Sequence, residues 1–233
     1  MRDNLQRVLD NIAAAAVRVR RDPANVRLVA VTKAMDFEDV KGLVELGVAD
    51  LGENRVKQLV QRVEAVEQWV GRRRKETPAV RWHMVGHLQR NKVKHVVGRV
   101  SLIHSVDSLR LAEDIDRRAE MAGQVVEVLL QVNCSAEPQK YGVAVGAAVA
   151  LAEQICTLRN LRLVGLMTMA PLVSDPEKAR PAFVRLREIF EEMRSEKVGG
   201  RDLRHLSMGM SQDYQVAVEE GATMVRIGTA LVR

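Results

Sequence analysis

The sequence predicts a closed (β/α)₈ barrel, in which eight parallel strands alternate with helices around one ring. Short apolar and β-branched runs alternate along the whole chain with longer segments of helical period. Strands that are separated by helices pair in parallel through right-handed crossovers. The 233 residues suit one such barrel, and no linker or internal repeat divides them. We therefore expect a single domain over residues 1–233.

Each expected element has its own pattern of apolar residues. The strands are expected at 26–32, 48–52, 80–85, 101–104, 125–133, 161–167, 203–207 and 224–227. The helices between them are expected at 36–47, 54–70, 90–98, 108–123, 143–160, 176–196 and 211–221. Asp36 and Ser108 are suited to cap helix starts, and Gly47, Gly98, Gly123 and Gly221 fall where helices stop.

The two ends of the chain support closure of the ring. Only "GTALVR" follows the last strand, which is too short for a full eighth helix. The N-terminal segment "MRDNLQRVLDNIAAAAVRVRRD" has charges throughout and is expected to be a helix, not a signal peptide. In a closed ring this helix would cover the gap between the last strand and the first.

Composition excludes several classes of protein. With 47% hydrophobic and 28% charged residues, the chain is suited to a large core, and no apolar run reaches the roughly 18 residues of a membrane span. Cys134 and Cys156 form no disulfide framework and no metal-binding spacing, which favours a reducing, cytoplasmic setting. The net charge of +6 suits nucleic acid or a phosphorylated small molecule, but 3% aromatic residues leave little for base stacking. We expect the basic run "GRRRKE" (71–76) to be a solvated helix end.

Polar residues follow the expected strands at the end where barrels build their sites. The first strand, "RLVAVTK", ends in Lys33; Asn54 follows the second in "LGEN", and His83 lies near the end of the third in "WHMVGH". A lysine at a strand end often extends its stem to reach water, which is the simplest explanation for Lys33. Because polar groups recur after all eight strands, we expect a functional site at this mouth of the barrel.

The last two strands are followed by glycines beside hydroxyl groups. "SMGMS" (207–211) contains Ser207 and Gly209, and "GT" consists of Gly228 and Thr229. Loops at these two strands often bind phosphate, because glycine lets backbone N–H groups approach an anion. The alternative is that both glycines serve tight turns. Since the two motifs occur together, we expect a phosphate site.

A phosphate site opposite a lysine suggests a particular ligand. A partly desolvated lysine has a lowered pKa and forms a Schiff base with an aldehyde. Pyridoxal 5′-phosphate (PLP) carries both a phosphate and an aldehyde. Arg226 lies two residues before Gly228 and is expected to face the pyridine nitrogen. No metal-ligating cluster is expected.

Eight motifs together resemble the pyridoxal phosphate homeostasis protein family, often called YggS or PROSC. They are "LVAVTK", "LGEN", "WHMVGHLQRNKVK", "HSVDS", "LLQVN", "LVGLMTMAP", "LSMGMSQDY" and "VRIGTAL", and the resemblance runs from about residue 5 to 231. It implies a barrel like the N-terminal domain of alanine racemase, with PLP held as an internal aldimine on Lys33. It also implies phosphate contacts from Ser207, Gly228 and Thr229, Arg226 at the ring nitrogen, and Asn54 and His83 lining the pocket. The chain departs from the family at "TKA" and "EPQKYG".

The resemblance leaves a choice between a cofactor carrier and an enzyme. Racemases of this type add a β-rich second domain that brings a catalytic tyrosine, whereas this chain ends with the barrel, and Tyr141 and Tyr214 have no evident partner base. We therefore expect a carrier in vitamin B6 homeostasis with no catalytic residues. A PLP-dependent racemase of low activity is the alternative. A lysine-based aldolase would need a carboxylate near the amine, for which Glu53 is the candidate.

The same resemblance suggests the partners. We expect PLP and apo PLP-dependent enzymes to be partners, with no binding to nucleic acid or membranes, and a monomer is favoured over a dimer. Lys140, in "EPQKYG", is either a second amine near the mouth or a solvated loop residue, and the sequence leaves both open.

Overall fold

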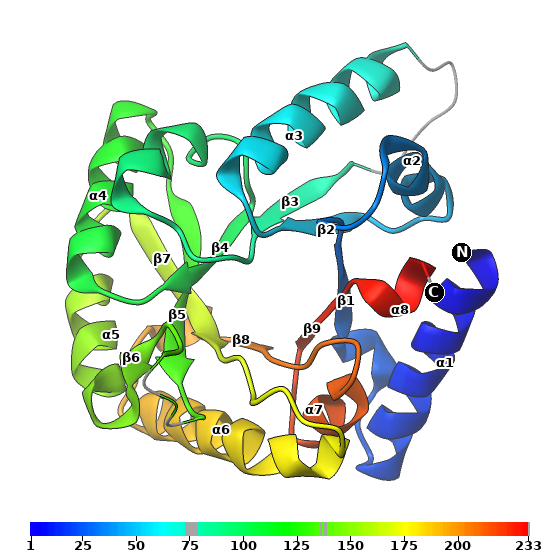
Figure 1. Ribbon diagram of the computed structural model, residues 1–233. Coiled ribbons are helices and arrows are strands. Elements are labelled where there is room, and N and C mark those ends of the chain that lie inside the picture. The colour runs from blue at the N-terminus through cyan, green and yellow to red at the C-terminus, as the bar shows by residue number, and fades with distance from the viewer. Residues whose placement is uncertain (73–78, 136, 138, 233) are drawn as a thin grey trace.

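The chain forms a ring of parallel strands with helices around the outside (Figure 1). The computed structural model describes residues 1–72, 79–135, 137 and 139–232. The ring consists of β1 (Arg27–Val31), β2 (Asp50–Glu53), β3 (Arg81–Met84), β4 (Leu102–Val106), β5 (Val126–Asn133), β7 (Leu161–Met167), β8 (His205–Ser207) and β9 (Met224–Ile227). Pairing of β4 with β5 and of β1 with β9 closes it, which confirms the predicted barrel. The prediction of a single domain stays a prediction.

The helices cover the outer face of the ring. They are α1 (Arg2–Arg18), α2 (Phe37–Glu45), α3 (Val56–Gly71), α4 (Leu109–Met121), α5 (Ala148–Cys156), α6 (Arg180–Ser195), α7 (Tyr214–Glu219) and α8 (Thr229–Val232). Short 3₁₀ helices are η1 (Pro23–Asn25), η2 (Arg90–His95), η3 (Val145–Ala147), η4 (Pro176–Ala179) and η5 (Gly200–Asp202). A two-residue strand, β6 (Val143–Ala144), pairs with β5 and was not predicted.

One predicted helix is wrong. Residues 90–98 were expected to form an α-helix, but η2 has i→i+3 bonds such as Val96 N to Val93 O. The buried side chains of this segment, Val93, Val96 and Val97, recur over a single turn, so a short, tight helix is enough to bury them. Of the basic run 71–76, residues 73–76 lie outside the described residues.

The predicted helix boundaries hold where a cap defines them. Asp36 accepts a hydrogen bond from Asp39 N at 2.8 Å, and the Asp39 side chain accepts one from Asp36 N, which is a capping box. Ser108 occupies the N-cap of α4, but its side chain makes no capping hydrogen bond. The four predicted helix-stop glycines all have positive φ, between +63° at Gly123 and +104° at Gly221.

The N-terminal helix covers the junction of the ring, as predicted. In Figure 1, α1 lies beside α7 and α8. Asn11 Nδ2 donates to Tyr214 Oη at 2.9 Å, and Asn4 Nδ2 donates to Leu231 O at 3.3 Å. The hydrogen bonds that α1 makes to the last two helices therefore hold the β9–β1 seam from outside.

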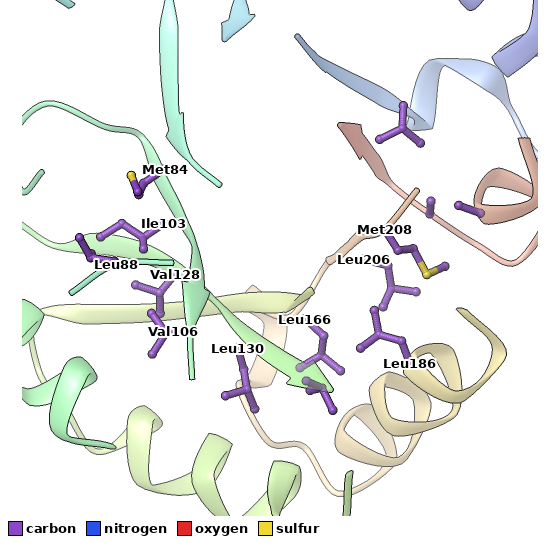
Figure 2. Packing of buried hydrophobic residues seen from close by; sticks show 14 of the residues in the cluster. Met84, Leu88, Ile103, Val106, Val128, Leu130, Leu166, Leu186, Leu206 and Met208 are labelled. Atoms are coloured by element: carbon purple, nitrogen blue, oxygen red, sulfur yellow. The ribbon is translucent and has the colours of Figure 1, made fainter. Parts of the chain in front are cut away.

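The core has two layers. The larger layer lies between strands and helices and includes Met84, Ile103, Leu130, Leu166 and Leu206 (Figure 2). Alternate strand residues point into the ring instead. They form two separate apolar clusters, one of Leu102, Leu129, Val164, Met167 and Met224 and one of Val29, Val31 and Val85. Among the described residues, no helix is both long enough and apolar enough to cross a bilayer.

Strands β7 and β8 approach closely at one point. A Cβ added to Gly165 would lie 1.9 Å from the backbone oxygen of His205, its partner on β8, so this position requires glycine. His205 packs there with its Nδ1 3.3 Å from Thr223 Oγ1. Burial, together with the charge of Arg204, lowers the pKa of His205 to about 4, and the imidazole is neutral at pH 7.

Replacing Gly165 by alanine should destabilise the barrel. The new methyl group would overlap the backbone of β8, which is paired with β7 on one side and β9 on the other, so Gly165→Ala should lower the free energy of unfolding by about 1–3 kcal/mol. Gly146→Ala is the matched control, because nothing lies within 4 Å of a Cβ at that position. Chemical denaturation of both variants measures the difference, and equal stabilities would contradict the prediction.

Stability should fall on acidification, and His205 should contribute. The folded-state pKa of about 4 lies below the ordinary 6.5, so between these values the unfolded chain binds the extra proton. The contribution is therefore complete above about pH 6.5 and is lost toward pH 4, with a slope of up to about 1.4 kcal/mol per pH unit. Denaturation at several pH values should give a shallower slope for His205→Gln than for the wild type. Identical slopes would show that His205 titrates normally.

Candidate functional site

Lys33 lies at the mouth of the barrel, next to the loop that follows β9. It comes two residues after the end of β1, and its side chain is exposed. The register pairs Val29 with Arg226 and Ala30 with Ile227. As a result, a Cβ on Gly228 would lie only 3.2 Å from Val31 O. The first strand and the last therefore bring the predicted lysine to the predicted glycine loop.

A buried ion pair holds the turn that carries Lys33. Glu53 Oε1 accepts a hydrogen bond from Thr32 Oγ1 at 2.5 Å and lies 2.8 Å from Arg62 Nε. Arg62 in turn donates to Met35 O at 2.5 Å, and Met35 N donates to Thr32 O. Burial raises the pKa of Glu53, against the hydrogen bond from Thr32 and the charge of Arg62. Glu53 thus fixes the residues on both sides of Lys33.

Arg226 is a buried cation on β9. Its Nη1 donates to Ser207 Oγ at 2.7 Å and its Nη2 donates to Thr168 O at 2.9 Å. Burial lowers the pKa of Arg226 to about 10, with the charge of Asp213 opposing the shift. The guanidinium is still protonated at neutral pH, so it places one fixed positive charge inside the barrel two residues before Gly228.

The hydroxyl group of Ser211, in the loop after β8, accepts hydrogen bonds from two backbone N–H groups at the end of β9 and the start of α8. Gly228 N and Ala230 N both donate to Ser211 Oγ at 3.3 Å. Convergent N–H groups of this kind are the arrangement that binds anions. Thr229 begins α8 with an exposed side chain. The predicted Gly228 and Thr229 therefore lie together with Ser211, which was part of the "SMGMS" motif but was not singled out.

Gly209 has a structural reason to be glycine. Its φ is +92°, and a Cβ there would lie 2.6 Å from Ala217 Cβ and 2.9 Å from Tyr214 Cα in α7. The tight turn and the close approach of α7 account for this residue without a ligand. Its predicted contact with a cofactor stays a prediction.

Ser207 and His83 are buried inside the barrel. Ser207 is fully buried, and its Oγ is 2.9 Å from His104 Nδ1 as well as 2.7 Å from Arg226 Nη1. His83 Nδ1 lies 2.9 Å from His104 Nε2, and His83 Nε2 lies 2.9 Å from Asp50 Oδ1. Burial lowers the pKa of His83. A direct contact from either residue to a cofactor stays a prediction.

Asn54 is at the mouth, as expected from its place after β2. It is half-buried and borders a surface cavity of about 590 Å³ between the start of α3 and η2. A Cβ on Gly86 would lie 2.2 Å from Asn54 O, so the loop after β3 packs directly on the backbone of Asn54. The structure thus gathers Lys33, Asn54, Gly228 and Thr229 at the mouth.

Two residues that the sequence did not single out complete the polar groups inside the barrel: His104 joins His83 to Ser207, and Asp50 binds the other side of His83. Asp50 and His104 both face into the ring and are at most 5% exposed. The signal was present, since an aspartate opens one apolar strand and a histidine interrupts another. It could not be interpreted, because only the pairing register tells which inward-facing residues meet.

Two further residues near the mouth are held by local contacts. Lys140 Nζ donates to Glu137 Oε1 at 2.6 Å and to Ala170 O at 3.1 Å, so this half-buried amine joins two loops. Burial raises the pKa of Cys134 to about 11, which keeps this free thiol protonated.

Among the described residues, no His, Cys, Asp and Glu side chains cluster in a way that would hold a metal ion.

Comparison with known proteins identifies relatives along the whole chain. Residues 4–233 match the family model described as "Alanine racemase, N-terminal domain". A "Pyridoxal phosphate homeostasis protein" of Aquifex aeolicus is 39% identical over 229 residues, which cover 98% of this chain and 96% of the relative. A protein of the same name from Pseudomonas aeruginosa is 36% identical, covering 96% and 94%.

Solved structures agree with these relatives. A crystal structure of an unknown protein from Bifidobacterium adolescentis has a TM-score of 0.91 at 38% identity and covers 98% of this chain and 93% of its own. PipY of Synechococcus elongatus, solved with PLP bound, has a TM-score of 0.80 at 32% identity, covering 95% and 100%. An alanine racemase of Clostridium difficile has a TM-score of 0.73 at 16% identity, covering 98% of this chain and 56% of its own, and shows the shared fold alone. The chain belongs to the pyridoxal phosphate homeostasis protein family and, through its barrel, to the larger alanine racemase N-terminal domain family.

Proposed function

We propose that this protein binds PLP at the mouth of the barrel and acts as a carrier of the cofactor in vitamin B6 homeostasis. One observation carries the proposal: pairing of β1 with β9 brings the exposed amine of Lys33 beside the backbone donors of Gly228 and Ala230, with the buried charge of Arg226 two residues away. An amine, an anion-binding loop and a fixed cation match the three functional groups of PLP.

Each group of PLP has a candidate partner among these residues. The N–H groups of Gly228 and Ala230, with the hydroxyls of Ser211 and Thr229, are suited to the phosphate. The Lys33 amine is suited to bond the aldehyde carbon. Bound PLP supplies a ring that withdraws electrons from an attached amine. Arg226 retains its proton at neutral pH, so it would donate to the pyridine nitrogen and leave that nitrogen unprotonated, which weakens electron withdrawal.

The relatives support this assignment. The PipY structure carries PLP, and its whole length is covered at 32% identity. The curated relatives from Aquifex aeolicus and Pseudomonas aeruginosa are named for PLP homeostasis. In this chain, the residues that would contact the cofactor are the lysine, the glycine loop and the arginine described above.

The surroundings of the tyrosines and of Glu53 favour a carrier over an enzyme. Tyr214 is buried, and its Oη accepts a hydrogen bond from Asn11 beneath α1, away from the mouth. Tyr141 stacks on His87 with ring centroids 3.9 Å apart, which uses the face of the ring rather than its hydroxyl. Glu53 is held by Thr32 and Arg62. A racemase of low activity is the alternative, and the fold shared with alanine racemases does not distinguish the two.

Partners and setting belong to the same proposal. A protein that holds PLP without efficient turnover would supply apo PLP-dependent enzymes, and a monomer leaves the mouth open for that exchange. Two free cysteines suit a reducing, cytoplasmic setting.

Lys33 should be the attachment site. Treating the PLP-loaded protein with borohydride should fix a pyridoxyl group to the peptide that contains Lys33, and mass analysis should locate it there. Lys33→Ala should lose the adduct. Lys140→Ala is the matched control, since its amine is engaged by Glu137 and Ala170, and it should keep the adduct. An adduct on other lysines, with none on Lys33, would sink the assignment.

The loaded protein should not turn over ordinary amino acids efficiently. Lack of one well-placed proton-transfer group typically lowers a rate by about 10²–10⁴-fold. A panel of L- and D-amino acids, followed by chirality and keto-acid assays, should show a trace at most, while an apo PLP-dependent enzyme mixed with the loaded protein should regain activity. A rate constant within the usual enzymatic range of roughly 1–10³ s⁻¹ for any amino acid would contradict the carrier proposal and show that the protein is an enzyme.

A further inference from the structure

A continuous chain of buried hydrogen bonds crosses the barrel. Asp50, the first residue of β2, lies at the end of the barrel opposite the mouth. Its Oδ1 is 2.9 Å from His83 Nε2, and His83 Nδ1 is 2.9 Å from His104 Nε2. His104 Nδ1 is then 2.9 Å from Ser207 Oγ, which accepts from Arg226 Nη1 at 2.7 Å. All five residues are at most 5% exposed, so water has little access to these bonds.

Asp50, at the lower end of this line of hydrogen bonds, is held as a carboxylate. Arg81 binds Asp50 through two contacts, Nε to Oδ1 at 2.9 Å and Nη2 to Oδ2 at 2.6 Å, and Arg27 Nε lies 3.8 Å from Oδ2. Burial alone would raise the pKa of Asp50, but the hydrogen bonds from His83 and Arg81 hold it well below its ordinary value. A carboxylate only accepts, so His83 Nε2 carries a hydrogen and donates.

The hydrogen on His83 Nε2 determines where the hydrogens of His104 and Ser207 lie. Burial lowers the pKa of His83 and lowers that of His104 further, so both imidazoles are neutral. With its hydrogen on Nε2, His83 can only accept at Nδ1, and His104 Nε2 must donate to it. His104 Nδ1 is then bare and accepts from the Ser207 hydroxyl. The hydrogen of Ser207 points away from Arg226, and its lone pairs face the guanidinium.

Ser207 is therefore a fixed acceptor for Arg226. If the order were reversed, His104 Nδ1 would donate to Ser207, and the Ser207 hydrogen would have no acceptor left, because the other partner that the described residues offer it, Arg226 Nη1, is itself a donor. The carboxylate at the bottom of the barrel excludes that reversed order. The contact of Arg226 with Ser207 is thus set from the other end of the molecule.

We propose that Asp50 is a positioning residue for the cofactor site, and that it acts through His83, His104 and Ser207 to fix the orientation in which Arg226 meets a pyridine nitrogen. This inference depends on the proposed binding of PLP. It also assigns Ser207 to the arginine rather than to the phosphate, for which Ser211 beside Gly228 and Ala230 is the better-placed hydroxyl.

The proton order can be measured without any cofactor. Nitrogen NMR of ¹⁵N-histidine-labelled protein should show His83 and His104 each protonated at Nε2 and bare at Nδ1. Asparagine both donates and accepts, so Asp50→Asn should allow both orders and give His104 a fraction protonated at Nδ1. Leu102→Ala is the matched control, because it opens a cavity inside the ring but leaves the chain intact, and it should keep the wild-type pattern. A wild-type His104 that is protonated at Nδ1 would overturn the proposal.

Two ligands separate positioning from general stability. PLP presents a pyridine nitrogen to Arg226, whereas 1-deazapyridoxal 5′-phosphate has carbon at that position. Coupling of this kind is typically worth 0.5–2 kcal/mol, so Asp50→Asn should weaken PLP binding by about two- to thirtyfold. The same substitution should leave binding of the deaza analogue unchanged. Leu102→Ala should change the two affinities equally or not at all.

The outcomes are distinct. If the wild type binds both ligands and Asp50→Asn weakens both equally, Asp50 is merely structural and the inference fails while the proposed function stands. If the wild type binds neither ligand, the proposed function fails and this inference fails with it. Should Asp50→Asn not fold, His104→Phe cuts the same chain with a ring of similar size, and the same selective loss of PLP affinity is expected from it.

Discussion

Pairing of the first strand with the last is the constraint on which the rest of the structure depends. The four register pairs between β1 and β9 close the ring and set Val29 opposite Arg226. From that register follow the position of Lys33 past the strand end, the approach of Gly228 to Val31, and the turn of Gly228 and Ala230 toward Ser211. Helix α1 supports the seam from outside through Asn4 and Asn11. A slip by one residue would send Arg226 to the outer layer, since alternate residues face opposite sides of a strand.

The interior of the barrel contains polar side chains as well as apolar ones, whereas the layer between strands and helices is apolar. Two small hydrophobic clusters fill part of the ring, and a line of five hydrogen-bonded side chains passes through it. A neutral hydrogen bond contributes only about 1 kcal/mol net, whereas an unpaired buried group costs about 1–3 kcal/mol. Such a line is therefore tolerated only when each member is satisfied. The charges at its two ends, Asp50 with Arg81 below and Arg226 above, give it a single direction.

The strands and most helix boundaries could be predicted, because each depends on nearby residues. Periods of two and 3.6 mark the elements, and Asp36, Gly47 and Gly221 act within a turn of their own position. The α-helix predicted at 90–98 is wrong, because three valines that are spaced for a helix need only one tight turn to be buried. Ser207 has hydrogen-bond partners that its sequence context does not predict. Its strand was predicted correctly, but its partners come from β4 and β9, and no local pattern reports which inward-facing residues of distant strands meet.

The seam also has a consequence for how the protein is made. Lys33 is synthesised long before β9, and it reaches its neighbours there only once β9 has left the ribosome. Contacts this distant in sequence form late, because the loop between them must be closed before they gain anything. Until then the lysine amine has neither the Gly228 loop beside it nor the arginine that lies two residues before Gly228. A growing or truncated chain that ends before β9 therefore carries the lysine without these neighbours, and the proposed cofactor site forms only when the ring closes.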